Sequence, residues 1–239
     1  MRTVVYISGQ PREVAYCWKS WWYNCISNFP NPEVFIYTDQ KYPVDKEFFD
    51  VVKPRKYLVE PQVMHPEHKA ALDKINYISE NHKNSLAQQQ YGKKMVWELA
   101  DRWQKESGAK YDYAIRLRPD LIIMQKISPE IIDFNCINTL NRKSDIVTCE
   151  FCISNFNIIK DYMHIYDWTV RFAPKICVNG HPRLPAGSPW HSDFMMGVYM
   201  EDVCKHKMAE GPHITTSSNY YRILRIFHQY GNMQFDTKM

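Results

Sequence analysis

Arginine and aspartate lie together between two apolar segments in the middle of the chain, where Arg118, Pro119 and Asp120 separate Tyr113–Leu117 from Leu121–Met124. Both segments are short and rich in β-branched or aromatic residues, which favours buried strands. Pro119 lacks a backbone donor and fixes φ, so a strand must break there. Open α/β sheets bind ligands beyond the carboxyl ends of their strands. An aspartate there can hold a divalent cation and arginine suits a diphosphate, so the segment predicts a site for a phosphorylated donor such as a nucleotide sugar.

A second group of candidates follows the first predicted strand, Thr3–Ser8. These donor-binding candidates form the turn into a helix and are Ser8, Gly9, Gln10 and Arg12. Backbone amides at the start of that helix, together with the guanidinium of Arg12, would meet the nucleotide or diphosphate end of a donor. An ordinary turn between a strand and a helix is the alternative interpretation.

Two more donor-binding candidates have structural alternatives. Asp39 follows the second predicted strand, where it would hold a ribose or base, or lie in a solvated turn. Arg116 lies within a strand and either contributes to the site or pairs with a carboxylate such as Asp112. Asp120 could also cap the turn after Pro119, because aspartate often accepts hydrogen bonds from nearby backbone amides.

The last fifty residues supply candidates for the acceptor side and for a metal. Asp193 is a candidate site residue, although a carboxylate at the start of a helix is favourable in itself. Trp190 and His191 precede it and are acceptor-binding candidates, since an indole ring can stack on a sugar, although Trp is also a good core residue. His213 is a candidate metal ligand together with Asp120.

The composition is that of an ordinary globular protein. The chain has 239 residues, 45% hydrophobic and 23% charged, and a net charge of +4, without the dense basic stripe of a nucleic-acid binder. Seven irregularly spaced cysteines, including one Cys149/Cys152 pair, predict reduced thiols and a cytoplasmic protein, in the host cytoplasm if the source is viral. We expect no transmembrane segment and no signal peptide.

The elements that must position these residues follow an α/β order. A strand over Thr3–Ser8, a helix over Glu13–Asn28 and a strand over Glu33–Thr38 form a βαβ unit. We further expect strands at Arg55–Val59 and Asp145–Phe151, a loop at Val63–Pro66, a helix over Ser85–Ser107 capped by Ser85 and Gln88, and helices over Asn157–Phe172, Ser192–His206 and Ser218–Gly231. The turn-rich Pro174–Pro189 segment is a candidate lid. The prediction is one α/β domain over 1–239, Rossmann-like, with a mostly parallel central sheet flanked by helices.

Four segments together resemble the GT-A-like nucleotide-sugar-dependent glycosyltransferases, in particular viral and bacterial members that build surface or capsid glycans. They are Ile7–Arg12, Val34–Asp39, Tyr113–Leu121 and Trp190–Gly197. The resemblance implies a donor-nucleotide half over 1–124 and an acceptor half with C-terminal helices over 125–239. It also matches Asp120 to the carboxylate that binds Mn²⁺ or Mg²⁺ in the Asp-x-Asp motif of such enzymes, while Arg118 replaces the first aspartate of that motif. The resemblance further matches Asp193 to a carboxylate that such enzymes present near the acceptor, which makes Asp193 the candidate general base for the acceptor hydroxyl.

What the resemblance implies is transfer of a hexose or deoxyhexose from a nucleotide-diphosphate sugar to a hydroxyl of a glycan or glycoprotein. The partners would then be that donor and that acceptor, with no nucleic acid. Two alternatives stay open from the residues: another phosphate-handling transferase of the sulfotransferase type, and a non-enzymatic domain that binds glycans or nucleic acid.

Overall fold

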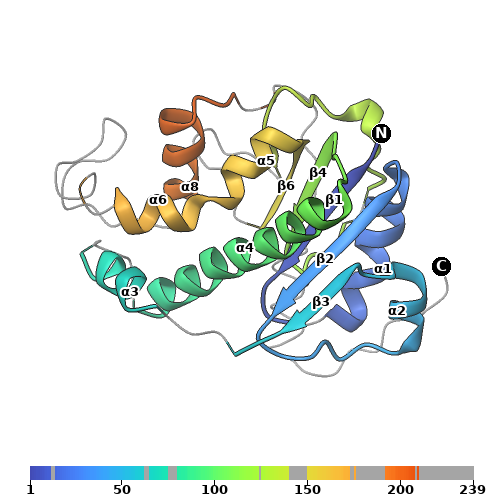
Figure 1. The fold of residues 1–239 in the computed structure, drawn as a ribbon, viewed down its shortest axis with the longest axis horizontal. Helices are drawn as coiled ribbons and strands as arrows, with labels where there is room; N and C mark the ends of the chain where they lie inside the picture. Colours follow the sequence, from blue (N-terminus) through green and yellow to red (C-terminus); the bar gives the residue numbers. More distant parts are fainter. Residues whose placement is uncertain are drawn as a thin grey trace.

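The structure is a computed structural model. The structure describes residues 1–11, 14–61, 65–74, 80–123, 125–139, 150–172, 175, 192–207 and 209, and of residues 80–82 and 192 the backbone alone. The described residues form a six-stranded mixed sheet with helices on both faces (Figure 1). The predicted α/β class with a mostly parallel sheet is therefore confirmed.

The chain adds strands first on one side of its first strand and then on the other, so the order of strands reverses near the centre of the sheet. The order is β3-β2-β1-β4-β6-β5. The strands are β1 (Thr3–Ser8), β2 (Pro32–Thr38), β3 (Lys56–Val59), β4 (Tyr113–Leu117), β5 (Asn138–Thr139) and β6 (Phe151–Asn155). The first four are parallel, whereas β6 runs antiparallel to β4 and to β5. The chain moves from β1 outward to β2 and β3 and then returns to β4 on the other side of β1, so β1 and β4 flank the topological switch point.

Helices cover the two faces of the sheet unequally. The helical segments are α1 (Val14–Asn24), η1 (Ile26–Asn28), α2 (Lys46–Val52), α3 (Pro66–Leu72), α4 (Glu80–Ser107), η2 (Pro129–Ile131), α5 (Phe156–Met163), α6 (Ile165–Arg171), α8 (Ser192–Gly197) and the π-helical η3 (Val198–Val203). Alternate residues of β1 face opposite sides, with Val5 and Ile7 packing with α1 and α2. Val4 and Tyr6 pack with α4, α5 and α6. The long α4 crosses the sheet on this second face (Figure 1).

The predicted strand at Leu121–Met124 is wrong over its described part. Leu121 and Ile123 are buried, as a strand would require, but they belong to no strand. Side chains of α1 take the place of a strand ladder, because Ser20 accepts from the Ile123 amide at 3.1 Å and Asn24 donates to the Ile123 carbonyl at 2.7 Å. The backbone is thus satisfied without pairing.

Three helix boundaries also differ from expectation. The helix α4 begins at Glu80, so Ser85 lies inside it and does not cap it. The ammonium of Lys83, in the first part of α4, donates to Asp73 directly after α3 at 2.6 Å and so stabilises this earlier start. The predicted helix over Asn157–Phe172 is two helices, which part at His164, where ψ is 9°. The helix expected to end at His206 ends at Val203 and finishes as a π-helix.

Two short helices were not expected. Asp45 caps α2 by accepting from the Phe48 amide at 3.3 Å, and Lys53 ends it with a left-handed φ of 45°. Pro66 opens α3, which shortens the expected loop at Val63–Pro66. In both segments the apolar residues are too few for periodicity to reveal a helix.

Among the described residues, no helix combines the length and the apolar character needed to cross a membrane. The predicted Ser218–Gly231 helix lies outside the described residues. So do the Pro174–Pro189 segment, except for Lys175, and the predicted Asp145–Phe151 strand, except for Glu150 and Phe151.

Candidate functional site

The carboxyl ends of β1 and β4 bring the two main sequence motifs together at the switch point. Ser8 ends β1 and Gly9 follows it, while Arg118 and Pro119 follow β4. Gly9 has φ 139° and packs so closely that a β-carbon there would lie 3.1 Å from Cγ of Arg118 and 3.2 Å from Cδ of Pro119. This is the contact between segments more than a hundred residues apart that creates the site.

Arg118 is held at this edge by two carboxylates. Its Nε donates to Asp120 Oδ1 at 2.5 Å, and its Nη1 donates to Glu150 Oε1 at 3.1 Å. The Arg118 amide also donates to the Glu150 carbonyl at 2.8 Å, because Glu150 immediately precedes β6, the antiparallel neighbour of β4. The guanidinium is buried, so its orientation is fixed from two sides.

Arg116 lies beneath Arg118 on the face covered by α4. It is buried and donates from Nη2 to the Ser8 carbonyl at 3.1 Å and from Nη1 to the Glu150 carbonyl at 3.4 Å. The alternative of an Arg116 pair with Asp112 is wrong, since Asp112 accepts from the Arg2 amide at the other end of the sheet.

A second buried cation, Lys93, approaches Arg116 from α4. Its ammonium lies over the ring of Tyr162 at 5.4 Å from the centroid. Burial raises the pKa of the Cys152 thiol, and the charges of Arg116 and Lys93 oppose that shift, so both cations act on the same place. Positive charge is therefore concentrated under the carboxyl edge, on the α4 side.

Glu150 is under the electrostatic influence of two further carboxylates, Asp120 and Asp193. Burial raises the pKa of Glu150; Arg118 opposes the shift, while the charges of Asp193 and Asp120 add to it. Asp193, in the first turn of α8, is thus brought within electrostatic reach of the β4 motif from more than seventy residues away. A carboxyl group whose pKa is raised by burial and by neighbouring charges marks a place where several ionisable groups interact.

Several buried polar atoms near this edge have no hydrogen-bond partner among the described residues. They are Ser8 Oγ, Asp39 Oδ1, Tyr42 Oη and Gln90 Nε2. Tyr42 is electrostatically linked to the site, because burial raises the pKa of its phenol while Arg116 lowers it and Asp120 and Asp39 raise it. Such atoms normally find a partner in protein, water or ligand.

The predicted residues are therefore placed as follows. The structure brings together at one edge Ser8, Gly9, Arg116, Arg118, Asp120 and Asp193. Asp39 follows the end of the neighbouring strand β2. The side-chain amide of Gln10 donates to Gln88 of α4 at 3.5 Å. Arg12, Trp190, His191 and His213 lie outside the described residues.

Sequence reasoning missed Lys93, Glu150 and Tyr42. A signal for Lys93 was present, because it falls in the buried α4 stripe of Leu86, Gln90, Lys93, Trp97 and Ala100, where a charge is unusual. Glu150 gave no such signal, since its place depends on the antiparallel pairing of β6 with β4.

The residues at this edge fit a divalent cation in one limited way. The described residues contain no group of three metal-ligating side chains, and Asp120 and Glu150 both hold Arg118. Mg²⁺ usually takes one or two carboxylates and completes its shell with water and substrate phosphates. Asp120 and Glu150 offer the hard oxygen atoms for that arrangement.

Searches of protein-family models and of curated proteins found no match to this chain.

Proposed function

We propose that the chain is a GT-A-like glycosyltransferase that moves a hexose or deoxyhexose from a nucleotide-diphosphate sugar to a hydroxyl of a glycan or glycoprotein. The observation that carries the proposal is the meeting of the Ser8–Gly9 turn with Arg118 and Pro119 at the switch point, where Arg118 also binds Asp120. This crevice is where open α/β sheets bind nucleotides. The reduced state of the described cysteines agrees with a cytoplasmic site of action, which is part of the same proposal.

The donor diphosphate would lie against Arg118. A guanidinium binds phosphate oxygens through two parallel hydrogen bonds, and its charge stabilises the negative charge that develops on a leaving diphosphate. Arg116 and Lys93 lie deeper and add positive potential to the same edge. When bound, Mn²⁺ or Mg²⁺ at Asp120 would supply further charge neutralisation for the diphosphate.

Asp193 would act as the base that takes the proton of the acceptor hydroxyl. Its carboxylate is half-buried and lies close enough to Glu150 to raise the pKa of that neighbour. Glu150 is engaged with Arg118, which leaves it the role of orienting that guanidinium. The two carboxylates therefore have separable roles.

Donor binding is the first test. We would record thermal shifts with the UDP, GDP, CMP and dTDP series and their sugars, each with Mn²⁺, Mg²⁺ or EDTA. A ligand at about 100 times its Kd adds roughly 2.7 kcal/mol to the free energy of unfolding. We expect one nucleotide series to raise the midpoint, and we expect Asp120→Ala to remove the part of the shift that depends on metal. No shift in any series would overturn the proposal.

Catalysis is tested with the nucleotide sugar that the panel selects and water as the acceptor, by following release of the nucleoside diphosphate. Asp193→Asn should lower kcat about 100-fold or more and leave donor Kd within about threefold, because general bases contribute roughly 10²–10⁴. Glu150→Gln is the matched carboxylate-to-amide control and should weaken donor binding through Arg118. Equal loss of donor binding and of turnover in Asp193→Asn would remove Asp193 from the base role.

A further inference from the structure

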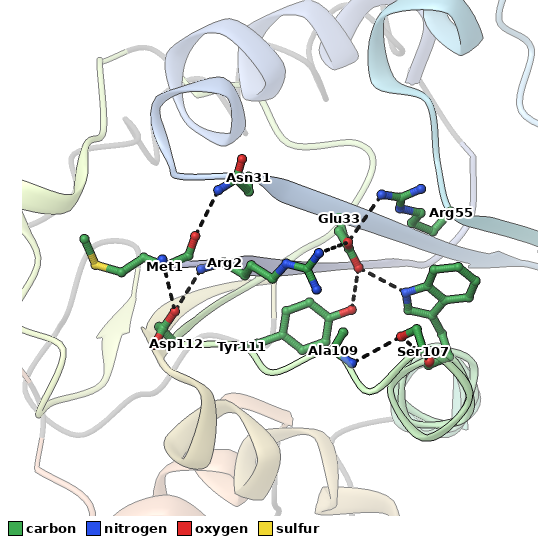
Figure 2. A network of polar contacts seen from close by, with 10 residues as sticks. Met1, Arg2, Asn31, Glu33, Arg55, Ser107, Ala109, Tyr111 and Asp112 are labelled. Atoms are coloured by element: carbon green, nitrogen blue, oxygen red, sulfur yellow. Dashed lines mark hydrogen bonds and ion pairs between the residues drawn. The ribbon is translucent and has the colours of Figure 1, made fainter.

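At the opposite, amino end of the sheet a buried carboxylate collects four donors. Glu33 Oε2 accepts from Tyr111 Oη at 2.7 Å and from Trp103 Nε1 at 3.1 Å. Glu33 Oε1 faces Arg55 Nη2 at 3.3 Å and Arg2 Nη2 at 4.0 Å. Figure 2 shows the two guanidinium groups converging on Glu33, with Tyr111 reaching it from the other side.

The two arginines are only partly used by this carboxylate. Their side chains are 49% and 50% exposed, in contrast to the buried Glu33. Each guanidinium carries several N–H donors, and the ion pairs with Glu33 engage one nitrogen of each. Glu33 thus fixes the inner side of both groups, and their charges exceed the single negative charge that it supplies.

Neighbouring contacts hold the guanidinium of Arg55 and the backbone of Arg2 in place. Arg55 lies over the ring of Trp103 at 5.6 Å from the centroid, and the Lys56 ammonium lies over the same ring at 5.8 Å, which adds a further positive charge. The Arg2 amide donates to Asp112 Oδ2 at 2.8 Å, so its backbone is anchored to the start of β4. Two preorganised guanidiniums lose less freedom on binding an oxyanion than mobile ones would.

A surface pocket of about 400 Å³ opens in front of this pair and is lined by Arg2, Asn31, Pro32, Glu33 and Arg55. Its volume falls within the range of small-molecule sites. Asn31 adopts a left-handed φ of 45° and donates to the Met1 carbonyl at 3.1 Å, which holds the rim in position (Figure 2). We propose that this amino-end pocket is a second binding site, distinct from the donor site, for the phosphate or carboxylate group of a small molecule, which Arg2 and Arg55 clamp between them.

The test follows the indole N–H signal of Trp103 by NMR, since that group belongs to the network. Inorganic phosphate and glucuronate are titrated separately at constant ionic strength, and Trp103→Phe identifies the signal. We expect a saturable shift with at least one probe, and the tighter of the two probes shows whether phosphate or carboxylate is preferred. Arg2→Gln/Arg55→Gln should weaken the binding at least tenfold. A Trp103 signal that stays still, or that follows chloride equally, overturns the proposal.

Matched variants separate this site from the donor site and from a folding defect. Arg118→Gln removes a cation at the other end of the sheet and Lys46→Gln removes an exposed one, and both should keep the Trp103 response. Asn31→Asp keeps both arginines and tolerates the left-handed backbone. It replaces the amide that donates to the Met1 carbonyl with a competing carboxylate in the pocket, so it should weaken phosphate binding several-fold. Unchanged affinity in both Asn31→Asp and the double arginine variant would refute the clamp. Donor binding is read independently, so either proposal can fail without the other.

Discussion

The two ends of the sheet arrange charge in opposite order. At the amino end the carboxylate of Glu33 is buried, whereas Arg2 and Arg55 are about half exposed. At the carboxyl end the cations are buried and the carboxylates reach the surface: the side chains of Asp120 and Glu150 keep 21% and 25% of their exposure. One end offers guanidiniums to the solvent and the other offers carboxylates.

The two ends also differ in how completely their charges are compensated. Glu33 receives donors on both oxygens, so its burial is matched by hydrogen bonds and ion pairs. At the carboxyl end Asp120 and Asp193 raise the pKa of Glu150, so like charges remain close together. Repulsion of this kind is common where a protein awaits a ligand that carries the missing charge. The amino end thus compensates its buried charge fully, whereas the carboxyl end keeps like charges close together.

The largest effect is expected from removing the charge of Glu33 at the amino end of the sheet. Glu33→Gln keeps the shape of the side chain but removes the charge and turns one acceptor into a donor that faces Tyr111, Trp103 or the arginines. Removing one partner of a buried charge network costs about 3–5 kcal/mol, and urea denaturation measures the loss in the free energy of unfolding.

A matched surface carboxylate provides the control for Glu33. Glu47 meets Lys19 at 2.8 Å, but both side chains are about half exposed, so Glu47→Gln should leave the urea midpoint unchanged. If Glu33→Gln left the midpoint equally unchanged, the buried network would contribute nothing to stability, and the comparison between the two ends would fail.

Low pH is expected to destabilise the protein through the buried side chain of His68. Its Nε2 lies 3.0 Å from Gln90 Oε1, two residues before Gly92, which packs against Ser8. Burial lowers the pKa of His68 to about 4, and the Gln90 bond only partly opposes this. In the unfolded chain His68 takes up a proton near the usual pKa of histidine, about 6.5. In the folded protein it stays neutral until the pH falls to about 4.

The sign of the effect follows from linkage. The stability contributed by neutral His68 is present above about pH 6.5 and is lost as the pH falls toward 4, by up to about 3 kcal/mol. Urea denaturation at several pH values measures this loss. His68→Gln should flatten the slope in this window, whereas His164→Gln should keep it. Equal slopes in the wild type and in His68→Gln would show that other groups carry the acid sensitivity.

The sequence predicted the strands that pack on both faces far better than the segments between them. Thr3–Ser8 and Tyr113–Leu117 were located to the residue, because mostly apolar runs that are soon followed by Gly or Pro leave little choice. Leu121–Met124 has the same composition, yet α1 side chains satisfy its described backbone instead of a neighbouring strand. Apolar content reports burial, and whether a buried segment pairs depends on which partners the rest of the fold supplies.

The candidate site was predictable in its parts and not in its contacts. Arg118 and Asp120 stood out locally, and Asp193 stood out at a helix start, but nothing in the chain placed Glu150 between them. That placement comes from the antiparallel β6, which returns the chain to the carboxyl end of β4. Long-range strand pairing of this kind leaves little trace in local periodicity.

A pair of glycines tests whether close packing serves the carboxyl end in particular. Gly9 and Gly108 both have positive φ, at 139° and 68°, so alanine is strained at either. At Gly108 a β-carbon would meet nothing within 4 Å, and we expect a loss of about 1 kcal/mol. At Gly9 the same atom would press on Arg118 and Pro119, so Gly9→Ala should cost about 1–3 kcal/mol and weaken donor binding about tenfold.

Denaturation and donor titration of both glycine variants provide the measurement. Gly108→Ala should bind the donor as the wild type does, because Gly108 directly follows α4, and its neighbours Ser107 and Ala109 lie near the Glu33 network at the amino end of the sheet (Figure 2). Normal donor binding in Gly9→Ala would mean that Arg118 can shift without cost, and that its fixed position is not required.

The smallest expected effect compares the two ends of a single strand. Thr3 and Ser8 begin and end β1 and both are buried, but Thr3 Oγ1 donates to the Pro30 carbonyl at 2.9 Å, whereas Ser8 Oγ has no partner among the described residues. Thr3→Val should therefore lose about 1 kcal/mol of unfolding free energy. Ser8→Ala should be neutral or gain up to about 1 kcal/mol, since it removes a buried hydroxyl that the described protein does not satisfy. If the hydroxyl is kept for the donor, the same Ser8→Ala variant should bind the donor several-fold more weakly while it melts at the same or a higher temperature. A variant that lost stability as Thr3→Val does would show that Ser8 has a structural partner and that the carboxyl end of β1 is no different from its start.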